Sequence, residues 1–271
     1  MMRYVANARM YSVNPAAASA WKDLFGWLAR ESGVGLDVID HSFPLPLADL
    51  WSRSDLACGF MCGYPFALAA LKPQPVAAPV PVAAPIPGRP VYATRLVVRA
   101  DSKFGSIEDT FGGRLGYTIE DSHSGYNALR HHLLPYYQMR GAKLYRESIG
   151  PLFTPRRVIE ALLAGDIDVG PLDSYALDLM LRHEPDLGQK IRTVATTDIA
   201  PIPFLVASTD CPNEVVSQLQ AALARFADCS DTAGLRDRLC LEGFVPVEAD
   251  DYGLTARWDD EARKAGYSQP G

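Results

Sequence analysis

The sequence lacks a long apolar run and a recognisable secretory leader. No stretch of its 271 residues reaches the roughly 18 consecutive apolar residues that a helix needs to cross a bilayer. The opening MMRYVANARMYSVNP has neither the charged start and apolar core nor the small-residue cleavage site of a signal peptide. We therefore expect a protein that is not transmembrane. As encoded it is expected to stay in the cytoplasm, and it would work in the periplasm if a signal segment had been removed.

Basic tracts and the common catalytic and metal-binding motifs are also missing. The formal net charge is -6, and no run of lysine and arginine marks a nucleic-acid surface, so no nucleic-acid partner is expected. Neither a paired C-x-x-C nor an H-E-x-x-H motif occurs, and five scattered cysteines do not form a disulfide framework. A dinucleotide fingerprint, a P-loop and a G-x-S-x-G motif are absent as well. We expect no metal, no cofactor and no catalytic residue.

The sequence does contain a regular alternation of apolar strands and capped helices. Asn14-Pro15 and Thr154-Pro155 each place a capping side chain before a proline in the first turn of a helix. Gly33 or Gly35 ends the first of these helices, and Gly165 ends the second. Continuous apolar segments such as LACGFMCG are typical of buried parallel strands. The pattern predicts an α/β protein with mainly parallel sheets.

Residues 73–90 contain seven of the 21 prolines. Because proline has no N–H group and a fixed φ, this composition argues against a central strand and favours an extended linker. The segment is apolar, so we expect it to lie against protein rather than in solvent. A clear strand follows it, and a second crossing is expected within residues 196–208. The predicted division is lobe one, residues 1–98 plus 205–271, and lobe two, residues 99–204.

The segment EDSHSGYNALR, residues 120–130, gathers acids, serines, a histidine and a glycine before an expected helix. The first N–H groups of a helix have no internal acceptor and lie at the positive end of its dipole, so this segment suits an anion. Ser122 or Asp121 also fits a simple helix cap. A catalytic Ser–His pair is disfavoured, because members of a triad meet from distant segments of the chain.

Three stretches together resemble a known family. They are VYATRLVVRADS (91–102), YTIEDSHSGYNALR (117–130), and AGDIDVGPLDSYAL (164–177) with IAPIPFLVAS (199–208). In order and spacing they resemble the substrate-binding proteins of phosphate, phosphite and phosphonate ABC transporters, over roughly residues 3 to 245. The resemblance implies the type II periplasmic-binding-protein fold, in which two α/β lobes are joined by two hinge strands and clamp the ligand in a cleft between them.

The resemblance also implies the ligand-binding residues. They are Tyr11, Tyr64, Tyr92, Ser122, His123, Ser124, Gly125 and Asp173. Residues 121–125 match a family loop in which backbone N–H groups, hydroxyls and a close-approaching glycine hold the oxyanion. His123 replaces a small hydroxyl residue of the family pattern, and it either donates to a dianion or narrows the pocket. Asp173 either meets the amine of an aminoalkyl-phosphonate or caps the helix that begins at Ser174, and the tyrosines form aromatic walls or belong to the core.

The implied function is that of a monomeric solute-binding protein for a small oxyanion such as a phosphonate, phosphite or phosphate. The implied partners are this ligand and an ABC-transporter permease. The alternative is a cytoplasmic enzyme or ligand sensor that uses the same fold and acts on a small carboxylated or aromatic metabolite.

Overall fold

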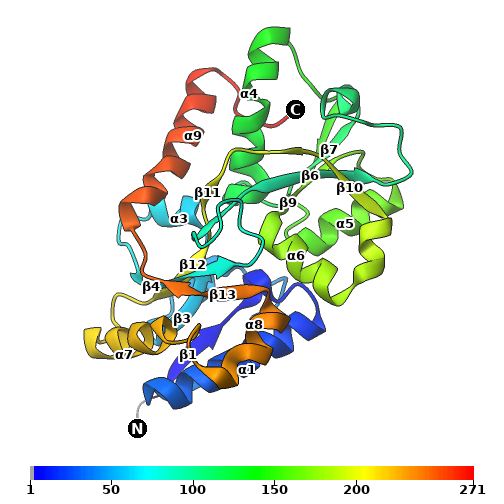
Figure 1. The fold of residues 1–271 in the computed structure, drawn as a ribbon. Helices are drawn as coiled ribbons and strands as arrows, with labels where there is room; N and C mark the ends of the chain where they lie inside the picture. Colours follow the sequence, from blue (N-terminus) through cyan, green and yellow to red (C-terminus); the bar gives the residue numbers. More distant parts are fainter. Residues whose placement is uncertain (1–2) are drawn as a thin grey trace. The chain divides into compact units, whose positions relative to one another are not determined.

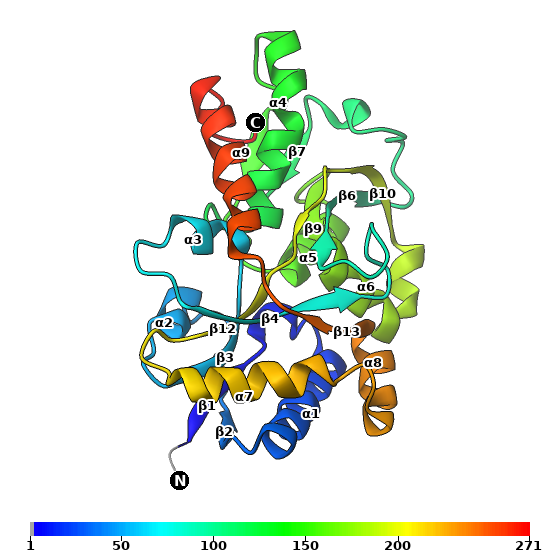
Figure 2. The same ribbon diagram turned by 60° about the vertical axis from the view of Figure 1, so that its left-hand side comes forward.

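The computed structural model describes residues 3–271 and divides them into two compact units (Figures 1 and 2). Unit 1 holds the chain up to Val91 and Pro201–Asp251, and unit 2 holds Tyr92–Ala200 and Tyr252–Gly271. The first crossing follows Val91, where the prediction placed it after residue 98, and the second follows Ala200, where the prediction placed it after residue 204. The last 20 residues differ, because the prediction placed them in lobe one and the structure places them in unit 2.

Unit 1 is built on a six-stranded sheet in the order β13-β4-β12-β3-β1-β2. The strands are β1 (Tyr4–Asn7), β2 (Leu36–Val38), β3 (Leu56–Met61), β4 (Gln74–Pro81), β12 (Phe204–Ala207) and β13 (Leu241–Val245). The helices are α1 (Pro15–Ser32), α2 (Leu47–Trp51), α3 (Gly63–Leu68), α7 (Asn213–Ala224) and α8 (Ala233–Leu239), and a short 3-10 helix, η1, spans Arg9–Tyr11. The α/β class is confirmed.

The sheets are mixed, so the prediction of mainly parallel sheets was wrong. In unit 1, β1 pairs with β2 and β3 in parallel, whereas β12 and β4 pair antiparallel with their neighbours. The reason is that β4 leads the chain out of unit 1 and β12 leads it back in. Two adjacent strands with these roles run in opposite directions.

The proline-rich segment supplies an inner strand of this sheet, which the sequence argued against. β4 lies between β13 and β12, and residues 76–81 are buried, as expected for a segment that lies against protein. The prolines are accommodated because β4 pairs with each neighbour over only half of its length. Residues 74–77 pair with β12, and residues 78–81 pair with β13. Each residue therefore needs ladder hydrogen bonds on one side only. In an ordinary inner strand the residues bond to neighbours on both sides, and proline is excluded for that reason.

Unit 2 contains a three-stranded antiparallel sheet in the order β10-β6-β9 and a parallel pair, β7-β8. The strands are β6 (Thr94–Arg99), β7 (Arg114–Gly116), β8 (Glu147–Ile149), β9 (Gly170–Asp173) and β10 (Ile191–Thr196). The helices are α4 (Ala128–Arg140), α5 (Pro155–Ala164), α6 (Ser174–His183) and α9 (Gly253–Lys264), and a π-helical turn, η3, spans His123–Asn127. The short strands β5 (Val91–Tyr92) and β11 (Ala200–Pro201) pair where the chain passes between the units.

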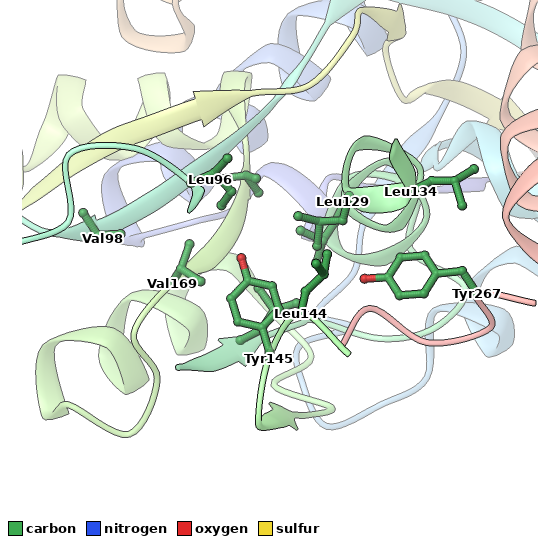
Figure 3. Close-up of a cluster of buried hydrophobic side chains, with 11 residues drawn as sticks. Leu96, Val98, Leu129, Leu134, Leu144, Tyr145, Val169 and Tyr267 are labelled. Carbon is green, nitrogen blue, oxygen red and sulfur yellow. The ribbon is translucent and has the colours of Figure 1, made fainter. Parts of the chain in front are cut away.

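The core of unit 2 includes the end of the chain. Figure 3 shows Tyr267 beside Leu134 and Leu144, in a buried cluster to which β6, α4 and the segment before β8 also contribute. The Tyr267 ring stacks on Tyr137 of α4 at a centroid distance of 4.4 Å. α9 runs beside α4 in both ribbon views (Figures 1 and 2). These contacts explain why the last 20 residues belong to unit 2.

Candidate functional site

The segment between β7 and α4 forms the start of a long helix in unit 2. It opens as a π-turn whose first hydrogen bond runs from Asn127 N to Ser122 O, at 3.0 Å. The N–H groups of residues 123–126 therefore have no intrahelical acceptor, and Gly125 N donates to Ser122 Oγ at 3.0 Å. Ser122 is the cap that the sequence offered as one alternative. N–H groups without an intrahelical acceptor, here those of His123, Ser124 and Tyr126, are typical of a helix start that binds an anion.

Gly125 lies where no side chain fits. A Cβ atom built at this position would be 1.8 Å from Thr118 Oγ1 and 2.7 Å from Thr118 Cβ. The two residues also share a backbone hydrogen bond, from Thr118 N to Gly125 O at 3.2 Å. The glycine therefore lets the helix start approach the segment after β7, and its close neighbour is Thr118.

His123 is buried, with 1% of its surface exposed. Burial, with a smaller contribution from nearby His131, lowers the pKa of His123 to about 3. The imidazole is therefore neutral near pH 7. Its Nδ1 atom lies 3.2 Å from the side-chain nitrogen of Asn127, and its Nε2 atom is buried with no hydrogen-bond partner among residues 3–271. A neutral histidine can offer an anion one N–H donor but no charge.

Thr94 joins the loop to Asp173. Its hydroxyl donates to Ser124 O at 3.0 Å, and it pairs with Asp173 in the β6-β9 ladder. Asp173 is buried, and its Oδ1 atom accepts from Ala176 N at 3.0 Å. Asp173 therefore caps α6, as the second interpretation of this residue proposed. Asp173 and the loop are therefore neighbours, because Thr94 contacts both.

The predicted tyrosines fall into both units. Tyr92, 1% exposed, lies in unit 2 with its ring 6.2 Å from that of His123. Tyr11 and Tyr64 lie in unit 1 and are also buried. Tyr11 is in η1 just after β1, and Tyr64 is in α3 just after β3, so both follow the carboxyl ends of adjacent parallel strands. Ligands of open α/β sheets commonly bind at such an edge.

Tyr11 has a clear packing role as well. Its ring meets Phe60 edge-on at 4.9 Å and stacks near Trp21 at 6.5 Å. With 1% of its surface exposed, Tyr11 is packed as a core residue, and its role as an aromatic wall for a ligand stays a prediction.

Sequence reasoning missed four residues around the loop: Thr94, Thr118, Asn127 and Trp258. Thr94 and Thr118 sit in or beside strands, where a threonine is unremarkable, so the sequence offered no signal for them. Asn127 stood within the quoted segment and was read only as part of the helix. Trp258 lies beyond the part of the chain that carried the resemblance, and its ring stacks 5.3 Å from that of His123.

The charged residues of the loop are acids. Glu120 and Asp121 are exposed at its beginning. Within residues 3–271, no group of three or more histidine, cysteine, aspartate or glutamate side chains could hold a metal ion. An anion at this loop would therefore be held by hydrogen bonds and by the helix dipole rather than by a cation in the loop itself.

The family model of ABC transporter, phosphonate, periplasmic substrate-binding protein matches residues 12–252. The chain belongs to this phosphonate-binding family. Its role is therefore that of an ABC-transporter substrate-binding protein that binds a small ligand. A search of curated proteins finds no match to the chain.

Solved structures show the fold of this phosphonate-binding family member. A binding-protein component of an ABC phosphonate transporter from Pseudomonas aeruginosa has a TM-score of 0.81 at 14% identity, covering 98% of this chain and 88% of that chain. PhnD1 from Prochlorococcus marinus, in complex with methylphosphonate, has a TM-score of 0.75 at 15% identity, covering 97% and 98%. A Xanthomonas citri protein bound to chloride has a TM-score of 0.63 at 17% identity, covering 97% and 98%. The predicted periplasmic-binding-protein fold is confirmed.

The family that the chain matches is one of periplasmic substrate-binding proteins. In the part of the chain that the structure describes, no helix combines the length and the apolar character that crossing a bilayer requires.

Proposed function

We propose that this phosphonate-binding family member holds the oxyanion of a phosphonate, phosphite or phosphate at residues 122–125 of unit 2. The observation that carries the proposal is the π-turn, which leaves the N–H groups of His123, Ser124 and Tyr126 without intrahelical acceptors. Residues 123–127 are all buried, and hydrogen bonds to an anion are stronger where water is excluded. A compact tetrahedral oxyanion matches several convergent N–H donors without needing a lysine or arginine.

Methylphosphonate is the first probe, because PhnD1 of Prochlorococcus marinus is solved in complex with it. Phosphite, phosphate and 2-aminoethylphosphonate complete the set. The aminated compound tests the prediction that Asp173 meets a ligand ammonium group. One oxygen of Asp173 accepts from Ala176 N in the structure.

The test is titration calorimetry with each oxyanion, on the wild-type protein and on Ser124→Ala. We expect binding of at least one probe and a loss of affinity of about tenfold in the variant, as for one lost hydrogen bond to a charged group. Ser217→Ala, on the exposed face of α7 in unit 1, is the matched control and should bind normally. Gly125 is a poor probe, because any side chain there would meet Thr118. Equal affinity in Ser124→Ala and wild type would exclude the Ser124 hydroxyl from the site, and a wild type that binds none of the four probes would overturn the proposal.

Tyr11, Tyr64 and Tyr92 remain predicted ligand-contacting residues. Replacing each by phenylalanine removes the hydroxyl and keeps the ring, so packing contacts such as that of Tyr11 with Phe60 survive. A tyrosine whose hydroxyl contacts the ligand should lose affinity in this variant without a large change in the free energy of unfolding. A variant that binds as wild type would assign that tyrosine to the core.

We propose further that the protein acts as a monomer in the periplasm, delivers its ligand to a permease and does not turn it over. The family match favours this function over the enzyme or sensor alternative. Sedimentation of the purified protein tests the monomer, and cell fractionation tests the location. Ligand-dependent stimulation of the cognate transporter's ATPase in proteoliposomes tests delivery, and recovery of the unchanged ligand after incubation tests the absence of turnover. A protein retained in the cytoplasm that leaves the transporter unstimulated would restore the alternative.

A further inference from the structure

α9 reaches the candidate oxyanion loop from outside the part of the chain that the family model matches. The match ends at residue 252, and α9 begins at Gly253. The helix nevertheless packs on both η3 and α4, and Figure 2 shows it beside α4. The family match therefore does not cover the contact between α9 and the oxyanion loop.

Trp258 is the centre of that contact. It is buried, and its ring stacks on two histidines, His123 at 5.3 Å with an interplanar angle of 26° and His131 at 4.6 Å with 2°. The His123 ring also lies 6.2 Å from that of Tyr92. The imidazole of the loop thus has aromatic neighbours from two distant parts of the chain.

A second link fixes the protonated nitrogen of His123. The side-chain nitrogen of Asn127 donates to Thr255 O of α9 at 2.7 Å, which assigns it as the amide nitrogen, and it lies 3.2 Å from His123 Nδ1. An amide nitrogen only donates, so Nδ1 accepts and the ring proton is on Nε2. α9 therefore supplies both the stacking partner of His123 and the carbonyl that orients Asn127.

We propose that Trp258 is a positioning residue for the oxyanion loop. It holds the His123 ring at the first position of the π-turn, where Asn127 keeps the ring as its Nε2–H tautomer, and thereby sets the direction of the N–H groups that follow. The inference rests on the proposed function for its effect on affinity. Its effect on His123 itself does not depend on any ligand.

The experiment uses full-length protein labelled with ¹⁵N and compares Trp258→Ala, Trp258→Phe and Trp27→Ala with wild type. Long-range imidazole spectra report the tautomer of His123, and amide spectra report Gly125 and Asn127. Trp27 is the matched control, because it is a buried tryptophan of unit 1 that packs on Phe226. Methylphosphonate affinity is measured on the same samples.

The expected result is a single Nε2–H tautomer in wild type, loss of that signature in Trp258→Ala, and recovery in Trp258→Phe. Affinity should fall about tenfold in Trp258→Ala and return to within about threefold of wild type in Trp258→Phe. Trp27→Ala should lower stability and change neither readout. If Trp258→Ala does not fold, Trp258→Leu serves in its place, since it removes the aromatic ring and keeps an apolar side chain.

An unchanged His123 signature in Trp258→Ala overturns the inference, and so does wild-type affinity. If wild type binds none of the oxyanions, the proposed function fails, and the imidazole and amide spectra still decide whether Trp258 positions the loop.

Discussion

Burial of His123 should make the free energy of unfolding fall as the pH becomes acidic, and one substitution should remove this contribution. The folded protein holds this imidazole neutral, with a pKa of about 3, whereas an exposed histidine in the unfolded chain has an ordinary pKa near 6.5. Between these two values the unfolded state binds a proton that the folded state does not. The stabilisation is therefore complete above pH 6.5 and is lost as the pH falls toward 3.

The magnitude follows from the two pKa values. Each pH unit below about 6.5 costs about 1.4 kcal/mol, so the loss between pH 7 and pH 5 is about 2 kcal/mol from His123 alone. In His123→Phe the ring does not titrate and can still stack on Trp258. The variant should therefore lose about 2 kcal/mol less than wild type over the same range.

The assay is guanidinium unfolding at pH 7, 6 and 5, with His183→Phe as the control for removing one histidine. His132, whose pKa burial also lowers, is present in every protein compared, so its contribution cancels. Equal pH dependence in wild type and His123→Phe would refute the reasoning, because it would mean that the buried ring takes up its proton as readily as an exposed one.

Two further predictions concern the ion pair between α4 and α9 and the cap of the helix start. Asp259→Ala should lower the free energy of unfolding by about 3–5 kcal/mol, because it leaves the buried charge of Arg130 without its carboxylate. Arg263→Ala, which removes the exposed partner of the same carboxylate, should cost under about 1 kcal/mol in the same denaturation experiment, and similar losses in both variants would contradict this. Ser122→Ala should cost about 1 kcal/mol through the lost cap on Gly125 N. Ser122→Gly should cost only a few tenths, and a loss as large as that of Ser122→Ala would argue against capping.

Local signals in the sequence predicted their elements well. Asn14 and Thr154 cap α1 and α5 through their side chains, and Gly33 and Gly165 follow these helices in the left-handed conformation. Such caps are decided by a few neighbouring residues, so they can be read without knowing the rest of the fold. For the same reason the capping roles of Ser122 and Asp173 were among the alternatives considered.

Features that depend on distant segments could not be read in this way. The prolines of β4 were taken as evidence against an inner strand, because the sequence does not reveal that each half of the strand pairs on one side only. The neutral state of His123 was also out of reach, since it follows from burial, and one residue that covers the ring is Trp258, 135 residues further along the chain. Which residues of a loop meet a ligand is a question of the same non-local kind.

The end of the chain also governs when unit 2 can be finished. Tyr267 fills part of its core, and Arg130 of α4 finds its carboxylate on Asp259. A ribosome that has made everything up to residue 251 has supplied all of unit 1 and has left unit 2 with an open core and an unmatched arginine. Because domains generally fold as units during synthesis, unit 1 can complete its fold first, and unit 2 must wait until residues 252–271 have been made.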